Sequence, residues 1–287
     1  MIHTPFDYKA PRNLKKAIEL LTSGNALVIA GGTSLMNAIR TNRVNPSILV
    51  DIKNIKDVKG MSWKKVEGIL VIRSITTLSE IADSTKIVKS FPLLAEAINS
   101  INDPQYKNRA TIGGCLAFND PGADITAAIL ALNASISVSS KDGIRSIPAD
   151  SFFTGKFKTS LQPSEIIISI DIPLPLSSTK STYLKIKNQA NESAICGIAI
   201  VAEKTKEGIV RNCRITITGA TDCTKRLENV EAAINGRSLT KEDISEALAK
   251  IKSESLTFIS DIAASSDYRE HLAHVLTERA IIQIAGN

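Results

Sequence analysis

The sequence predicts a mixed α/β fold that passes into an α+β region near its carboxyl-terminal end. The first fifty or so residues alternate helix, strand, helix and strand, which implies a small and mostly parallel sheet. Two glycine-centred turns, residues 28–35 and 109–116, each adjoin an apolar run. A proline-rich linker at 173–179 precedes antiparallel strands and then helices. A length of 287 residues suits two domains, or one large domain with subdomains.

The amino-terminal segment, residues 1–55, shows its elements through hydrophobic spacing. Apolar residues recur at helical intervals over 14–21, and a glycine then ends the helix. The short apolar run 26–30 predicts a buried strand that leads through the first glycine turn into a helix over 34–40. A second strand is expected at 48–52.

A second segment is expected over residues 56–173. Thr77 and Glu80 have the spacing of a capping box, which opens a helix, and Asp120-Pro121 is suited to another helix start. The other elements expected here are a strand at 69–73, helices at 93–98 and 123–132, a strand near 136–138 and a strand at 165–172.

The third segment, residues 180–287, predicts an α+β domain. Two strands, 195–202 and 209–218, are joined by the turn at 206–208 and so run antiparallel. Helical periodicity then recurs around 227–234, 241–252 and 268–285.

Composition excludes several classes of protein. The hydrophobic content of 43% supports a real core, but no apolar run reaches the length of a membrane span. The net charge of +6 comes from lysines interleaved with acidic residues, and aromatic residues are only 4%. This pattern favours a solvated basic surface over nucleic-acid binding. The first residues lack the pattern of a secretory signal, so we expect a cytoplasmic protein.

Cysteine and histidine positions predict neither a metal site nor a catalytic triad. The four cysteines form no CxxC pair and have no zinc-like spacing with histidine. Only Cys115 lies in a glycine turn, where it is placed beside any ligand held there. The histidines, His3, His271 and His274, are distant in sequence from both turns and are expected to be structural or exposed.

The first glycine turn has the chemistry of an anion site. The amides of Gly31, Gly32, Thr33 and Ser34 can converge at a helix N-terminus, where negative charge is favoured. The turn lacks the G-x-G-x-x-G spacing of a Rossmann fingerprint and the G-K-[ST] of a P-loop, which disfavours nicotinamide and ATP. Taken alone, an ordinary strand-to-helix turn is an equally good interpretation.

The second glycine turn repeats that chemistry with Thr111 and the pair Gly113-Gly114. Two such turns could hold the two phosphates of a dinucleotide, which suggests a flavin carrier. Asp124 begins a helix, where it either interacts with the helix terminus or accepts hydrogen bonds from ligand hydroxyls. Lys185 and Lys187 could meet a phosphate or a flavin edge, although a solvated strand lysine is the simpler interpretation of each.

At this point the sequence resembles a known family, the FAD-binding medium subunits of molybdenum hydroxylases, which include carbon monoxide dehydrogenase, xanthine dehydrogenase and aldehyde oxidoreductases. Residues 30–35 (AGGTSL) are similar to the family's A-G-G-[HT]-[SD]-L, and residues 105–114 (QYKNRATIGG) to its Q-x-[RK]-N-x-[AG]-T-[IL]-G-G. The likeness continues, in the family's order, through 116–132, 152–155, 163–167 and 268–273, and so covers nearly the whole chain.

The resemblance implies a fold of the vanillyl-alcohol-oxidase type, in which two subdomains hold FAD between them and a C-terminal α+β domain packs alongside. By similarity, residues 30–35 and 111–114 hold the pyrophosphate, and Asp124 bonds flavin-side hydroxyls. Ile166 or Ile167 packs on a ring system, and Lys185 or Lys187 approaches the flavin. The cofactor-binding residues expected are Ile29, Ala30, Gly31, Gly32, Thr33, Ser34, Leu35, Ala110, Thr111, Gly114, Cys115, Ala123, Asp124, Ile166, Ile167, Lys185 and Lys187.

The resemblance also implies a function. In the family a large subunit holds the molybdenum-pterin cofactor and oxidises the substrate, whether an aldehyde, carbon monoxide, a purine or another compound. A small subunit with two [2Fe-2S] clusters relays electrons to the FAD of the medium subunit, which passes them to an external acceptor. We therefore expect an electron-transfer oxidoreductase subunit, without catalytic residues or a metal of its own, in a dimer of heterotrimers. The alternatives are a self-contained FAD-dependent oxidoreductase of the same fold, or a basic binding module without enzymatic activity.

Two positions depart from the family pattern. Cys115 stands where many relatives have asparagine or a small residue, and Asp103 stands where relatives often carry histidine. A four-cysteine insertion that carries a cluster in one branch is absent, so no cluster is expected in this chain.

Overall fold

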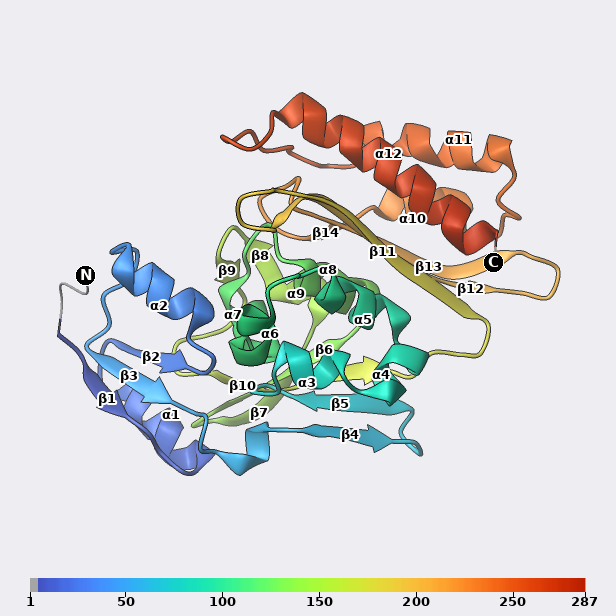
Figure 1. Cartoon of the computed structure of the whole chain (residues 1–287). Coiled ribbons are helices and arrows are strands. Elements are labelled where there is room, and N and C mark those ends of the chain that lie inside the picture. Colours follow the sequence, from blue (N-terminus) through green and yellow to red (C-terminus); the bar gives the residue numbers. More distant parts are fainter. Residues whose placement is uncertain (1–4, 287) are drawn as a thin grey trace.

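The computed structural model describes residues 5–286, so the sequence-based expectation for His3 lies outside the described residues. Figure 1 shows four layers above one another: a five-stranded sheet, a layer of helices, a four-stranded sheet and a second layer of helices. A three-stranded sheet with its own helices lies at one side of this stack. The mixed helix and strand fold that the sequence predicts is confirmed.

The amino-terminal part is a parallel three-stranded sheet with helices α1 (Leu14–Thr22) and α2 (Thr33–Arg40). Its strands lie in the order β1 (Asp7–Lys9), β3 (Ile48–Asp51) and β2 (Ala26–Ile29), all parallel as expected. Strand β1 was not expected, because it is three exposed residues at an edge and has no apolar pattern.

The central sheet is antiparallel and has β10 (Ile166–Pro173) in its middle. The strands follow the order β4 (Met61–Lys64), β5 (Ile69–Arg73), β10, β6 (Ser135–Ser140) and β7 (Gly143–Pro148). A bulge between Ile167 and Ser169 shifts the register of β10. By the ordinary alternation of a strand, Ile166 and Ile168 join the core under the amino-terminal sheet, while Ile167 joins the central core. The bulge allows Ile167 and Ile170 to share the central core.

Short helices cover one face of the central sheet (Figure 1). They are α3 (Leu78–Ala82), α4 (Thr85–Ser90), α5 (Pro92–Asn99), α6 (Pro104–Arg109), α7 (Ile112–Phe118), α8 (Asp124–Ala131) and α9 (Ala149–Phe152). A 3-10 turn, η1 (Lys56–Val58), precedes the sheet in the chain. A small hairpin is formed by β8 (Phe153–Gly155) and β9 (Lys158–Thr159). The expected capping box is present: Thr77 and Glu80 satisfy each other's backbone amides at the start of α3.

The carboxyl-terminal part is a four-stranded antiparallel sheet with helices on its outer face. The strands are β11 (Thr179–Lys187), β12 (Ala194–Lys204), β13 (Val210–Thr218) and β14 (Lys225–Arg226), followed by α10 (Glu228–Ile234), α11 (Lys241–Ala249), η2 (Lys250–Ser253) and α12 (Ser266–Ala285). Helix α12 contacts β11 and β12 from outside, whereas α5 and α8 contact the same sheet from inside. The three larger sheets fall in the segments 1–55, 56–173 and 180–287, except that β11 begins at Thr179, and the β8–β9 hairpin also lies in the second segment. We propose these segments as the domains.

Two local expectations were wrong. Asp120-Pro121 does not open a helix: α8 begins at Asp124, and the Asp120 carboxylate instead accepts a hydrogen bond from the amide of Gly122 in a tight turn. The second glycine turn is not a turn beside a strand, because Gly113 and Gly114 lie inside α7. Isoleucine and alanine around it fit a buried helix as well as a strand.

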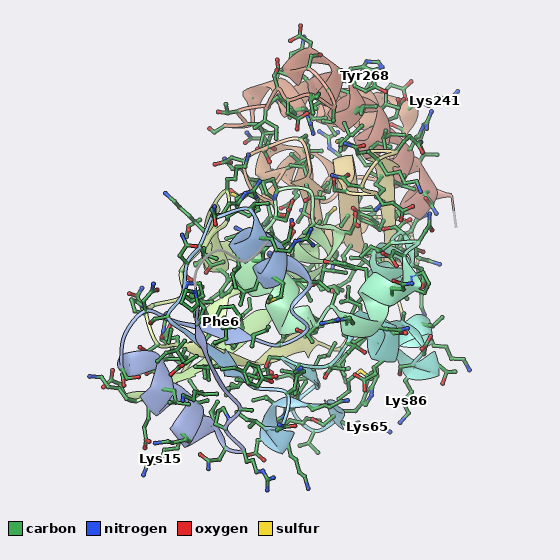
Figure 2. The ribbon with its side chains drawn as sticks, turned by 60° about the vertical axis from the view of Figure 1, so that its left-hand side comes forward. Phe6, Lys15, Lys65, Lys86, Lys241 and Tyr268 are labelled. Atoms are coloured by element: carbon green, nitrogen blue, oxygen red, sulfur yellow. The ribbon has the colours of Figure 1, made fainter. Side chains whose placement is uncertain are left out.

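The lysines are distributed as a solvated surface requires. Figure 2 shows Lys15 and Lys241 pointing outward from distant parts of the molecule and Lys65 and Lys86 pointing outward near each other, and each of the four is exposed. Within residues 5–286, no helix has the length and apolar character needed to span a bilayer. The same residues contain no cluster of ligands suited to a metal ion.

Truncation of a core residue and truncation of an exposed residue should have very different effects on the free energy of unfolding. Leu94 in α5 is fully buried, whereas Ile144 on the edge strand β7 is 70% exposed. We expect Leu94→Ala to reduce the free energy of unfolding by about 2–5 kcal/mol through lost transfer energy and cavity formation. Ile144→Ala should change it by less than about 0.5 kcal/mol. Urea denaturation at constant m-value measures both, and equal losses would contradict this assignment of the core.

Candidate functional site

The first of two neighbouring cavities lies between the amino-terminal sheet and the central sheet. It has a volume of about 490 Å³, and most of its wall is aliphatic. Leu27 and Val28 come from β2, Ile75 follows β5, and Ile166 and Ile167 begin β10.

A second and larger cavity, about 790 Å³, lies between the central part and the carboxyl-terminal domain. Its wall is more polar and includes Asp120, Asp124, Asn188 and Arg269. Thr33, Ser34 and Phe118 line both cavities, so the two meet at the start of α2.

The start of α2 is unusual because its first-turn amides have no acceptor. Gly32 occupies the N-cap with a φ of 75°, a left-handed conformation that favours glycine, and it provides no capping side chain. The first hydrogen bond of the helix runs from the amide of Met36 to the carbonyl of Gly32 at 3.1 Å. Among the described residues, no acceptor bonds the amides of Thr33, Ser34 and Leu35. Free amides at a helix N-terminus attract an anion, and this arrangement fits a phosphate.

The start of α7 is different, because its amides are already used. The amides of Ile112 and Gly113 donate to the carbonyls of Thr76 and Ser74, at 3.1 and 2.8 Å. The amide of Gly114 donates to the hydroxyl of Thr111 at 3.2 Å. A Cβ at Gly113 would lie 2.6 Å from Cβ of Ser74, so this glycine permits close packing of α7 on β5. The two turns therefore have different roles, since α2 offers free donors and α7 forms the wall opposite.

The two turns touch each other directly at Gly31. A Cβ at this position would lie 1.9 Å from the carbonyl oxygen of Arg109, so only glycine allows the backbones this close. The guanidinium of Arg109 also donates to the carbonyl of Gly31, with Nη2 at 3.1 Å. This contact fixes the position of α2 relative to α7.

Asp124 forms a buried charged group at the floor of the second cavity. Its carboxylate accepts a hydrogen bond from the hydroxyl of Tyr183 and one from Nζ of Lys185, the latter at 2.8 Å. All of these side chains are less than 10% exposed. Burial raises the pKa of Asp124, while the ammonium of Lys185 and the hydroxyl of Tyr183 act in the opposite direction. Burial and the neighbouring carboxylate raise the pKa of Tyr183, which stays a neutral donor.

The loop between β11 and β12 is fixed over the second cavity by Glu192. Its carboxylate accepts hydrogen bonds from Nζ of Lys187 at 3.0 Å and from the amide of Asn102 at 2.8 Å. Its carbonyl accepts from Nζ of Lys185 at 3.0 Å. Lys185 and Lys187 are therefore both engaged by protein groups, and neither lines a cavity directly.

The carboxyl-terminal sheet supplies one wall of the second cavity. The carbonyl of Pro121 accepts from the amide of Gly219 at 2.7 Å and from the hydroxyl of Thr218 at 2.9 Å. The carbonyl of Gly122 accepts from the amide of Ala194 at 3.1 Å. Ends of β12 and β13 thus determine the path of the chain that leads into Asp124.

Most of the sequence-predicted site residues meet around these cavities. The first cavity is lined by Ala30, Gly31, Gly32, Thr33, Ser34, Leu35, Thr111, Gly114, Ile166 and Ile167, and the second by Cys115, Ala123 and Asp124. Ile29 and Ala110 lie behind the turns and reach neither cavity. His271 and His274, on α12, line neither cavity.

Sequence reasoning missed Ser74, Phe118 and Arg269 as cavity residues. Arg269 is 2% exposed and donates to the carbonyls of Ile195 and Gly219 and to Asp261. It lies in the 268–273 motif, so the resemblance could have indicated it. Ser74 follows the end of β5, where a polar residue after an apolar run is a weak signal.

Comparison with known proteins agrees with this geometry. Residues 4–175 match the family described as the FAD binding domain in molybdopterin dehydrogenase, and residues 181–284 match the carbon monoxide dehydrogenase flavoprotein C-terminal domain. The chain is 31% identical over 283 residues to the carbon monoxide dehydrogenase medium chain of Hydrogenophaga pseudoflava, covering 98% of this chain and 97% of the relative. It is 31% identical over 277 residues to the nicotine 6-hydroxylase medium subunit of Paenarthrobacter nicotinovorans, covering 96% of each.

A solved structure of carbon monoxide dehydrogenase from Hydrogenophaga pseudoflava superimposes with a TM-score of 0.94 at 32% identity, covering 100% of this chain and 99% of that chain. The chain therefore belongs to the FAD-binding medium subunits of the molybdenum hydroxylases. It is an FAD-binding flavoprotein and a component of an oxidoreductase.

Because the first-turn amides of α2 are free, one substitution there should raise the stability of the flavin-free protein and lower its affinity for FAD. We expect Ser34→Asp to stabilise the flavin-free protein by about 0.3–1 kcal/mol, because a carboxylate is favoured at a helix N-terminus. The same charge repels a diphosphate, so affinity for FAD should fall at least about tenfold and recover partly at high salt. Thermal melts and fluorescence titration measure the two effects.

Ser34→Asn is the matched control for that variant, since it has nearly the same shape without the charge. It should leave FAD affinity close to that of the unmodified chain. Unchanged FAD binding by Ser34→Asp would mean that no phosphate lies at this helix terminus.

Cys115 is predicted to be an unreactive thiol despite its position at the cavity. Burial raises its pKa to about 11, so almost no thiolate is present at neutral pH. We expect alkylation of Cys115 by iodoacetamide at pH 8 to be at least about a hundredfold slower than that of free cysteine. The rate should rise about tenfold per pH unit until the pH nears that pKa. Mass spectrometry of the modified peptide measures this, and fast labelling at pH 8 would contradict it.

Proposed function

We propose that the chain holds FAD across both cavities, with the diphosphate at the first turn of α2. The observation that carries this proposal is the group of unpaired amides of Thr33, Ser34 and Leu35, at the point where the cavities meet. A dinucleotide has its charge between two ring systems, which matches a donor group between two hollows. The residues of this chain therefore suit the cofactor of its family.

The properties of the two cavities support one orientation of FAD. The first cavity is smaller and has aliphatic walls, including Ile75, Ile166 and Ile167, which suit the flat faces of adenine. The second is larger and polar, and Asp124 and Asn188 provide hydrogen-bonding groups for the flavin and its ribityl chain. In this proposal Asp124 serves as an acceptor for flavin-side hydroxyls, and Cys115 and Ala123 line the same half.

FAD accepts and donates electrons in one-electron or two-electron steps, and this chain has only to bind and orient it. The amides of α2 neutralise the diphosphate, and the wall of α7 excludes water from it. The pair formed by Asp124 and Lys185 adds no net charge beside the flavin half when both groups are ionised. Tyr183 fixes the carboxylate orientation by donating to it. No residue of this chain is required as a general acid or base.

The place of the chain in a larger complex is also a proposal. We propose that electrons arrive from [2Fe-2S] clusters of a small partner subunit and leave through FAD to an external acceptor. A large molybdenum-pterin subunit would oxidise the substrate, in a cytoplasmic dimer of heterotrimers. The relatives named as a medium chain and a medium subunit support this division of labour.

The first experiment is the visible absorption spectrum of the purified full-length chain, with and without added FAD. We expect a bound flavin spectrum, and release of FAD rather than FMN on heating. Ser34→Asp should lose most of that colour under the same conditions, while Ser34→Asn keeps it. A colourless wild-type chain that takes up no FAD, alone or with the partner subunits, would overturn the proposal.

A further inference from the structure

A third cavity lies at the end of the carboxyl-terminal sheet that is remote from the proposed flavin half. Its volume is about 1070 Å³, and it is lined by the linker at 173–177 and by residues from α4, β11, β12 and β13. Ser181 on β11 lines this cavity, whereas the 188–193 loop that follows β11 lines the second cavity. At about 3.3 Å per residue of strand, these two points are roughly 20 Å apart. The third cavity is therefore separate from the proposed FAD site.

Aromatic and aliphatic side chains form part of the wall of the third cavity. Trp63 and Phe91 contact each other there, with ring centroids 5.9 Å apart, and Leu132 and Leu174 also line the wall. Leu176 in the linker belongs to the same wall and is 60% exposed. Exposed apolar surface beside a polar rim is typical of an interaction site.

The rim of the third cavity has three lysines without a carboxylate partner. Lys65 lies in the turn between β4 and β5, and Lys86 and Lys89 are three residues apart on α4, so they share one helix face. All three are exposed, and Figure 2 shows Lys65 and Lys86 near each other. Within residues 5–286, none of the three forms an ion pair. Their charges are therefore available to a partner.

The other charged residues of the third cavity leave this excess of positive charge in place. Arg214 forms an ion pair with Asp150, and Arg226 forms one with Glu231. Among the described residues that line the cavity, Glu203 is the single carboxylate, against three lysines. Like charges on one rim repel each other, so carboxylates from a partner would lower the electrostatic energy there.

We infer that the third cavity is a docking surface for an acidic segment of a partner subunit. Carboxylates of that segment bind Lys65, Lys86 and Lys89, and its apolar side chains pack against Trp63 and Leu176. This inference rests on the proposed assembly of the chain with partner subunits. Because the cavity is a hollow, it fits a segment of protein better than a flat lipid surface. Because it is remote from the flavin half, the surface holds the complex together without taking part in electron transfer.

The test compares the affinity of the full-length chain for its purified partner subunits with that of the double variant Lys86→Glu, Lys89→Glu. We expect the variant to bind at least about tenfold more weakly at low salt, because like charges then face each other across the interface. Binding by the wild-type chain should weaken as salt is raised. The FAD content and visible spectrum of the variant should equal those of the wild-type chain. Surface plasmon resonance and absorption spectroscopy measure these quantities.

The double variant Lys15→Glu, Lys241→Glu is the matched control. It changes the net charge of the chain by the same amount, both lysines are exposed, and neither lines the third cavity. It should bind the partner subunits as tightly as the wild-type chain. In the wild-type complex, a carbodiimide should link Lys65, Lys86 or Lys89 to a carboxylate of a partner subunit, because this reagent joins amines and carboxylates that touch. Mass spectrometry identifies the linked peptides.

Four outcomes would overturn the inference while the flavin site stands. The first two are unchanged partner affinity in the Lys86→Glu, Lys89→Glu variant and equal losses in the two double variants. The third is cross-linking of these lysines only to a second copy of the chain. The fourth is loss of binding to phosphatidylserine vesicles with unchanged partner affinity, which would assign the surface to a membrane. A wild-type chain that binds FAD but no partner subunit would instead overturn the proposed assembly, and the inference with it.

Discussion

The site depends on the contact between Gly31 and Arg109. The amino-terminal sheet and the helical layer are remote in sequence, and their backbones meet at a distance that excludes any side chain at Gly31. The guanidinium of Arg109 closes the same contact by donating to the carbonyl of Gly31. Because α2 begins at Thr33, directly after this contact region, the direction of its free amides is set here. The contact between Gly31 and Arg109 therefore sets the boundary that the two cavities share.

Two carboxylates beside the second cavity each have a lysine partner. Asp124 is matched by Lys185, and Glu192 by Lys187. A buried ion pair adds little net stability, but removal of one member leaves an uncompensated charge. This explains why the two lysines, which the sequence suggested as cofactor contacts, are engaged by protein carboxylates. Their effect on a bound flavin would act through Asp124 and the 188–193 loop.

The sequence was sufficient to predict elements with a strong local signal. The strand at 69–73, the capping box at Thr77 and the final helix follow from hydrophobic period and capping chemistry. The exposed strand β1 has no such signal, and the bulge in β10 depends on pairing with β6. Asp120-Pro121 has the residues of a helix start, yet the turn there is held by strands almost a hundred residues later.

The candidate site was predicted from motifs, but the distinct roles of the two glycine turns were not. The sequence of each turn gives similar residues, and the difference arises from Ser74 and Thr76, whose carbonyls occupy the amides of α7. Those partners are supplied by tertiary packing, which no local pattern encodes. Ser74 and Phe118 were missed for the same reason, since a single serine or phenylalanine beside an apolar run is common.

The hydrogen bonds from Ala194, Thr218 and Gly219 to the 121–123 segment have a consequence for biosynthesis. A ribosome makes the central part first, and at that stage the carbonyls of Pro121 and Gly122 lack the donors that later hold them. The larger cavity gains its second wall only after residues 194–219 have been translated and folded. If FAD occupies both cavities as proposed, a chain that ends before residue 194 lacks one wall of the site.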